Sequence, residues 1–88
     1  MSRIKIRLFG TFRKWSESGE VELDIPLQAT VSDLKSVIEQ ELKKNPRTSD
    51  LSDIVFRSVL ADEHRILKDS EGIEDSVTLS ILPPVCGG

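Results

Sequence analysis

The sequence is poor in the residue types from which most active sites are built. It has one cysteine, Cys86, one histidine, His64, and no tyrosine. A single cysteine cannot form an internal disulfide bond, which agrees with a reducing compartment. There is also no glycine-rich phosphate loop and no pair of cysteine or histidine residues at metal-ligand spacing. We therefore expect no catalytic constellation, no bound cofactor and no metal site.

Long apolar runs and an excess of positive charge are missing as well. The uninterrupted apolar stretches are too short for a membrane-spanning helix or for the apolar segment of a signal peptide. The formal net charge is -3, so there is no basic excess to hold a phosphate backbone. These features predict a cytoplasmic protein with neither a membrane nor a nucleic acid as partner. With 88 residues, of which 38% are hydrophobic, the chain suits one globular domain.

Two segments near the N-terminus alternate between apolar and charged residues, as half-buried strands do. In residues 3–9 the outward positions are basic, and in residues 20–25 they are acidic. Turn-forming residues 16–19 separate the two segments, which predicts a hairpin with complementary charges across it. Phe9, Phe12 and Trp15 lie between the strands, where the aromatic rings suit either the core or a contact surface, and we favour the core.

One helix is predicted over residues 31–44. Thr30 is a suitable N-cap and Asp33 follows three residues later, which is an aspartate form of the capping box. Apolar residues recur at helical spacing on one face, and we expect Lys35 on the opposite, solvent-facing side. Asn45 and Pro46 end the helix.

The rest of the chain predicts three further strands, at residues 54–61, 64–67 and 77–82, with an acidic loop over residues 68–76. His64 lies in a charged stretch and is interpreted as a solvated strand-edge residue. The order is then β-β-α-β-β-β, which predicts an α+β fold of the β-grasp, ubiquitin-like type with a mixed sheet and one main helix packed on one face. We expect this domain to occupy residues 1–82 and an extended tail to occupy residues 83–88.

The tail is the most specific part of the sequence. Pro83 and Pro84 stop the last strand and favour an extended backbone. Six residues span at most about 20 Å, enough to thread a narrow channel in another protein. Gly87 and Gly88 have no Cβ, so the backbone can pass a constriction there. The pattern favours activation of the Gly88 carboxylate by another protein, and the alternative is a frayed end that happens to finish in two glycines.

The ending Ile81-Leu82-Pro83-Pro84-Val85-Cys86-Gly87-Gly88 resembles that of the small sulfur-carrier subunit of molybdopterin synthase, a family related to the thiamin sulfur carrier and to ubiquitin-like modifiers. The resemblance implies that an ATP-dependent activating enzyme adenylates Gly88 and that sulfur transfer then gives a thiocarboxylate. It also implies a molybdopterin synthase large subunit as partner, in a heterotetramer, which uses the sulfur to build molybdopterin. The chain would be a carrier subunit and not an enzyme, with ATP used by its activating partner.

The same resemblance implies roles for individual residues. Gly88 would carry the sulfur, Gly87 would pass the constriction, Pro83, Pro84 and Val85 would guide the tail, and Phe9 and Leu82 would dock on the partner. Cys86 stands where the family commonly has serine, threonine or alanine. Its thiol is either a tolerated small side chain in the partner contact or a group that takes a persulfide or joins a disulfide with a partner.

Other functions fit the same tail. One alternative is a carrier whose sulfur is destined for thiamin, cysteine or tRNA thiolation, although the double proline argues against the thiamin carrier. A different class is a ubiquitin-like modifier that forms isopeptide bonds between Gly88 and lysines of target proteins. A third is an interaction domain whose tail has no function, in which case deletion of Gly87 and Gly88 would change nothing.

Overall fold

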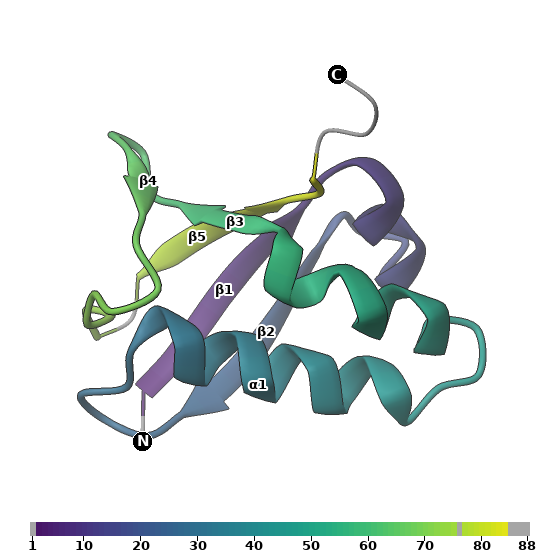
Figure 1. Cartoon of the computed structure of the whole chain (residues 1–88), viewed down its shortest axis with the longest axis horizontal. Helices are drawn as coiled ribbons and strands as arrows, with labels where there is room; N and C mark the ends of the chain where they lie inside the picture. The colour runs from purple at the N-terminus through teal and green to yellow at the C-terminus, as the bar shows by residue number, and fades with distance from the viewer. Residues whose placement is uncertain (1, 76, 85–88) are drawn as a thin grey trace.

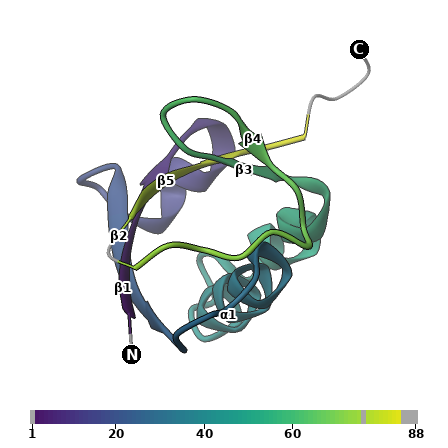
Figure 2. The same ribbon diagram turned by 90° about the vertical axis from the view of Figure 1, so that its left-hand side faces the viewer.

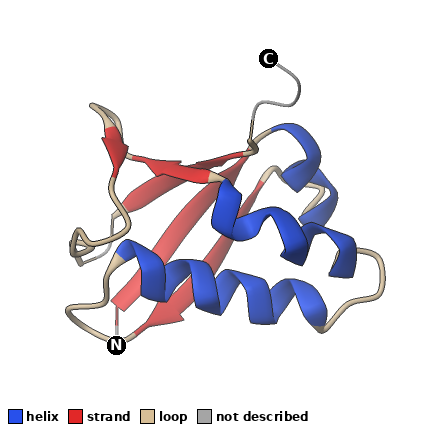
Figure 3. Ribbon diagram, in the orientation of Figure 1, coloured by secondary structure: helices blue, strands red, loops and turns tan. Residues whose placement is uncertain are grey.

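The computed structural model describes residues 2–75 and 77–84 of the chain. Five strands form one sheet in the order β2-β1-β5-β3-β4. In chain order the elements are β1 (Ser2–Leu8), the 3-10 helix η1 (Gly10–Trp15), β2 (Glu20–Ile25), α1 (Val31–Lys43), the 3-10 helix η2 (Ser49–Arg57), β3 (Val59–Ala61), β4 (Ile66–Leu67) and β5 (Thr78–Leu82). The predicted α+β class and the β-β-α-β-β-β order are confirmed (Figure 3).

The sheet is mixed, because β1 pairs with β2 in antiparallel and with β5 in parallel orientation. β3 is antiparallel to both β5 and β4. The predicted hairpin of β1 and β2 is confirmed, and so is the pairing of its charges. The Arg3 guanidinium lies 3.3 Å from carboxylate oxygens of both Glu22 and Asp24, and Lys5 lies 3.9 Å from Glu20. All these side chains are substantially exposed, so each pair contributes little to stability.

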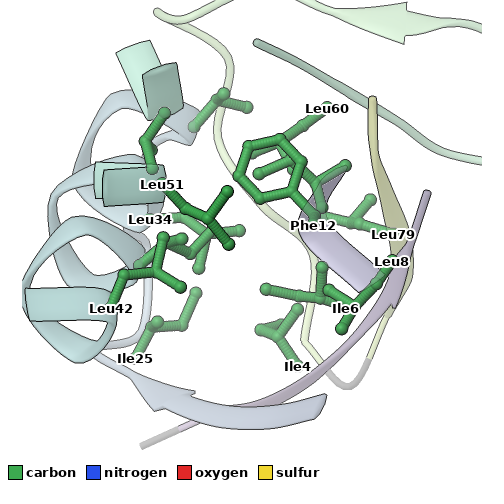
Figure 4. Close-up of a cluster of buried hydrophobic side chains, with 14 of the residues drawn as sticks. Ile4, Ile6, Leu8, Phe12, Ile25, Leu34, Leu42, Leu51, Leu60 and Leu79 are labelled. Carbon is green, nitrogen blue, oxygen red and sulfur yellow. The ribbon is translucent and has the colours of Figure 1, made fainter. Parts of the chain in front are cut away.

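The helices α1 and η2 lie together over one face of the sheet and leave the other face open (Figures 1 and 2). The apolar residues of β1 point toward them, as the sequence alternation predicted. Figure 4 shows the resulting core, in which Phe12 of η1 is enclosed between the sheet and the helices. The fully buried side chains include Ile4, Ile6, Phe12, Ile25, Val31, Leu34, Ile38, Leu42, Val55, Leu60, Leu79 and Ile81.

Helix α1 begins with the predicted capping box. The backbone N–H of Asp33 donates to Thr30 Oγ1 at 3.2 Å, and the N–H of Thr30 donates to Asp33 Oδ2 at 2.9 Å. The expected exposure of Lys35 was wrong, since this side chain is only 4% exposed. The acidic loop crosses the start of the helix and covers it, and Lys35 Nζ donates to Asp69 Oδ1 at 2.8 Å.

The predicted strand over residues 54–61 was too long. Residues 54–57 belong to η2, and only Val59–Ala61 form β3. Leu51, Ser52 and Val55 are buried, and Ser52 and Val55 are three residues apart, the spacing that shares one face of a 3-10 helix. This side of η2 packs against α1. The Ser52 hydroxyl also donates to the Ser49 carbonyl at 2.7 Å, a local bond compatible with a helical turn. In a short apolar run, the spacing of the apolar residues cannot distinguish a strand from a buried turn of helix.

The loop between β4 and β5 is bound to the N-terminal end of α1. The backbone N–H groups of Val31 and Ser32, which have no partner within the helix, donate to the carbonyls of Glu71 and Asp69 at 2.9 and 3.0 Å. The Glu71 carboxylate accepts two N–H bonds from Arg65 and one from the backbone of Lys68. These bonds, the Arg65 pair foremost, lower the pKa of Glu71 from its usual 4.5 to about 2.

We predict that Glu71→Gln destabilises the protein in a pH-dependent way. A carboxylate whose pKa is lower in the folded state contributes stability above its unfolded pKa, and this contribution disappears as the pH falls toward the folded pKa. The difference between wild type and variant should therefore be full at pH 7, shrink below about pH 4.5 and vanish near pH 2. Urea midpoints measured across this range check it.

Glu74→Gln is the matched control, because Glu74 lies in the same loop and makes no ion pair among the residues that the structure describes. A Glu71→Gln effect that is constant with pH, or equal to that of Glu74→Gln, would contradict the assigned role of the Arg65–Glu71 pair.

Candidate functional site

The site is built where the last strand ends. β5 lies between β1 and β3, and its final residues Ile81 and Leu82 are opposite Leu8 of β1 and Val59 of β3. Since β1 and β5 are parallel, the chain emerges from β5 beside the end of β1 and the beginning of η1 (Figure 1). The first two tail residues, Pro83 and Pro84, are half-buried at this position.

Three apolar residues from three segments meet on the open face next to this exit. Phe9 continues β1 with extended backbone angles of φ -130° and ψ 154°. Because Leu8 is opposite Ile81, the same register continued by one residue brings Phe9 beside Leu82. Leu82 is in turn paired with Val59. We call Phe9, Val59, Leu82, Pro83 and Pro84 the tail-exit surface.

Phe9 differs sharply from its aromatic neighbours. Its side chain is 41% exposed, whereas Phe12 is fully buried and Trp15 packs against the core while partly buried. The preference for a core position was therefore wrong for Phe9 and correct for Phe12. Strand alternation explains the difference, because the inward position at the end of β1 is occupied by Leu8.

A positive charge lies next to the apolar residues. Arg7 of β1 is the outward position before Phe9, and its guanidinium makes no hydrogen bond or ion pair with any other residue in ranges 2–75 and 77–84. Together with Phe9 and Arg13 it lines a shallow depression. Further along the same face, Ile66 of β4 is 59% exposed beside Ala61. The open face thus offers apolar contact area next to an available guanidinium, a combination typical of protein-binding surfaces.

The structure brings together four of the predicted site residues: Phe9, Leu82, Pro83 and Pro84. The other four, Val85, Cys86, Gly87 and Gly88, lie outside the described residues, and their roles remain predictions. Sequence reasoning missed Val59, whose outward position next to Leu82 depends on the sheet register. It also missed Gly10, which lies against Pro83 and whose only sequence signal is a glycine directly after a strand.

Residues 2–75 and 77–84 contain no group of three or more histidine, cysteine, aspartate or glutamate residues placed to hold a metal ion. His64 is exposed, and its backbone N–H donates to Asp62 Oδ1 at 2.7 Å. This bond and the one from Arg65 lower the pKa of Asp62, which acts here as a turn residue. None of the helices in the same ranges has the length and apolar character needed to cross a membrane.

Neither a family model nor a curated protein sequence matches this chain. Among solved structures, SAMP1 from Haloferax volcanii is similar with a TM-score of 0.67 and 17% identity, covering 98% of this chain and 99% of that chain. A Pyrococcus furiosus protein proposed to be molybdopterin converting factor subunit 1 has a TM-score of 0.69 and 26% identity over 97% of this chain and 100% of that one. The ubiquitin-like domain of Plasmodium falciparum Dsk2 has a TM-score of 0.61 and 20% identity, covering 93% and 96%.

These similarities extend over nearly the whole chain in each case. The chain therefore has the ubiquitin-like β-grasp fold, and the resemblance noted from the sequence is confirmed at the level of the fold.

We predict that Phe9 and Phe12 respond very differently to truncation. Phe12→Ala should cost about 3–5 kcal/mol because it leaves a cavity in the core. Phe9→Ala should lower the free energy of unfolding much less, by about 1 kcal/mol, because Phe9 is 41% exposed and lies outside the core cluster. Urea unfolding of both variants measures this. A comparable loss in the two would mean that Phe9 is a structural residue and is not available for docking.

Proposed function

We propose that this chain is a ubiquitin-like sulfur carrier for molybdopterin synthesis, with the Gly88 carboxylate as the group that becomes a thiocarboxylate. The observation that carries the proposal is the position at which the tail begins. The strand that precedes it is held between two others in the sheet, and the tail begins beside exposed apolar side chains. The similarity to the Pyrococcus furiosus protein, at 26% identity, supports the same pathway.

The chemistry would take place on partner proteins in two steps. In the first, an ATP-dependent activating enzyme lets the Gly88 carboxylate attack the α-phosphate of ATP, which forms an acyl adenylate and releases pyrophosphate. In the second, a sulfur donor at the oxidation level of hydrosulfide attacks the acyl carbon. A carbon–sulfur bond forms, the carbon–oxygen bond to AMP breaks, and AMP leaves. No electrons are gained or lost overall, and one oxygen of Gly88 has been replaced by sulfur.

The large subunit of the synthase would then accept the sulfur to build the dithiolene of molybdopterin. In this scheme the chain supplies the carrier group and the docking surface, and its partners supply the catalytic side chains. Phe9, Leu82 and Val59 would provide apolar contact to the partner. Pro83, Pro84 and Val85 would hold the backbone extended on its way into the partner, and Gly87 would pass the narrowest point.

Intact-mass measurement tests the proposal directly. We expect incubation with ATP, an activating enzyme and a sulfur donor to raise the mass by about 16 Da, the difference between sulfur and oxygen, at Gly88. A variant with one residue added after Gly88 should fold normally and show no increase, because the carboxylate is then displaced from the position that the enzyme adenylates.

Two results would contradict the proposal. One is an unchanged mass with an activating enzyme that is demonstrably active on its own carrier. The other is full conversion of the extended variant without removal of the added residue. Isopeptide conjugates between Gly88 and lysines of other proteins would instead indicate a protein modifier.

The thiol of Cys86 allows a separate prediction. If Cys86 is a tolerated small residue, Cys86→Ser should leave the rate of thiocarboxylate formation largely unchanged, because serine has nearly the same size. Quantitative mass spectrometry of timed reactions checks this. A large loss of rate would show that the thiol takes part in sulfur transfer, as a persulfide or as a disulfide with the partner.

A further inference from the structure

The first residue of the tail rests on a glycine. Gly10 is the first residue of η1, and the ring of Pro83 lies directly over it. A Cβ built on Gly10 would lie 2.6 Å from Cγ, 3.3 Å from Cδ and 3.8 Å from Cβ of Pro83. The first of these distances is far below van der Waals contact, so any side chain at position 10 would have to displace the proline ring.

Gly10 is also required for the turn that leads out of β1. Its φ is 58°, in the left-handed region that glycine enters without steric cost. This turn leads the chain from exposed Phe9 into η1, where Phe12 enters the core. The backbone N–H of Phe12 donates to the Phe9 carbonyl at 3.1 Å and closes the turn. The surface under Pro83 is thus made by a tightly constrained backbone.

A comparison with Gly19 distinguishes the need for a positive φ from the need for space beside Pro83. Gly19, before β2, has a φ of 83°, but a Cβ on Gly19 would meet nothing within 4 Å. Both glycines therefore satisfy a positive φ, and only Gly10 lies in contact with the tail. The absence of a side chain at position 10 follows from contact with Pro83 and not from the turn alone.

We propose that Gly10 is a positioning residue for the carrier reaction: it forms the seat on which Pro83 rests and so sets the point from which the tail enters a partner. This inference rests on the proposed function, since the positioning matters only if the tail is activated by another protein. Pro83 is held from two sides, by the end of β5 that precedes it and by the Gly10 seat beneath it. Phe9 lies next to the seat, so the docking contact and the start of the tail share one rigid turn.

A side chain at position 10 would have to move Pro83 by roughly 1 Å to restore ordinary contact distance. A displacement of that size at the start of the tail would shift the reacting carboxylate relative to the catalytic groups of the partner. Misplacement of reacting groups by about 1 Å can slow a reaction by up to about 100-fold. Docking through Phe9 and Leu82 would be less affected, so the loss should fall on kcat more than on KM.

The matched variants are Gly10→Asn and Gly19→Asn, because asparagine tolerates positive φ better than other residues with a side chain. We expect Gly10→Asn to lower kcat for pyrophosphate release by the activating enzyme about tenfold or more, with a smaller change in KM. Gly19→Asn should leave kcat as in the wild type, because a side chain there meets no part of the tail. Gly19 lines the depression beside Phe9, so any effect of this variant should fall on KM. Urea midpoints and circular dichroism of each variant show whether the fold is retained.

Relief of the clash provides a second, independent readout. Pro83→Ala removes the two ring atoms closest to position 10 and keeps only the Cβ at 3.8 Å. In the Pro83→Ala background, Gly10→Asn should therefore cause little further loss of kcat. A purely structural role of Gly10 in the turn predicts the same loss in both backgrounds. A folded Gly10→Asn variant with wild-type kcat, or a loss equal to that of Gly19→Asn, would overturn the proposal.

Nuclear magnetic resonance tests the contact between Gly10 and Pro83 without depending on the proposed function. Gly10→Asn should shift the resonances of residues 81–84, and Gly19→Asn should not. Unshifted resonances in a folded Gly10→Asn variant would contradict the inference that Pro83 rests on Gly10. If the seat is confirmed but the wild-type chain releases no pyrophosphate with an active enzyme, the proposed function fails and so does the role of Gly10 as a positioning residue for it.

Discussion

The parallel pairing of β1 with β5 is the constraint on which the remaining structure depends. Because the two strands run in the same direction, the end of β5 lies beside the end of β1, and Leu82 comes next to Phe9. An antiparallel pairing would have brought the end of β5 beside Ser2 instead. Backbone hydrogen bonds to β1 on one side and β3 on the other hold β5 in the sheet. The tail therefore starts from a fixed position, as a carrier that presents its last residue to another protein requires.

Under the proposed function, the same sheet would separate stability from recognition. One face is covered by α1 and η2 and contains the core (Figures 1 and 4). The other face remains open and has Phe9, Val59 and Leu82 near the start of the tail. The acidic loop lies at the opposite end of β5, where two of its carbonyls accept from N–H groups at the start of α1 and the Asp69 carboxylate binds Lys35. Substitutions at the exit should thus affect binding without unfolding the domain, since the interactions that stabilise the fold lie elsewhere.

Much of the fold was predictable because its signals are local. The alternation in β1 and β2, the capping box at Thr30 and the helical stripe of α1 each follow from residues close in sequence. The failures have a common cause. Residues 54–57 became helical because Leu51 and Val55 pack against α1, and Lys35 is buried because a loop more than 30 residues away covers it. Such contacts override local preference, and no short window of sequence contains them.

The candidate site, like the fold, has some features that follow from local sequence and others that depend on tertiary contacts. The sequence alone determined the chemical character of the tail, since two prolines restrict the backbone and two glycines lack side chains wherever they are placed. It also determined that Arg7 occupies an outward position near the end of the first strand, whereas Phe9, which we had assigned to the core, proved to be exposed only in the structure. Only the tertiary structure decided that Phe9, Val59 and Leu82 form one surface and that Pro83 rests on Gly10. These residues are separated by about 20 to 70 positions along the chain, and strand register, which is set by the packing of the whole core, decides which of them meet.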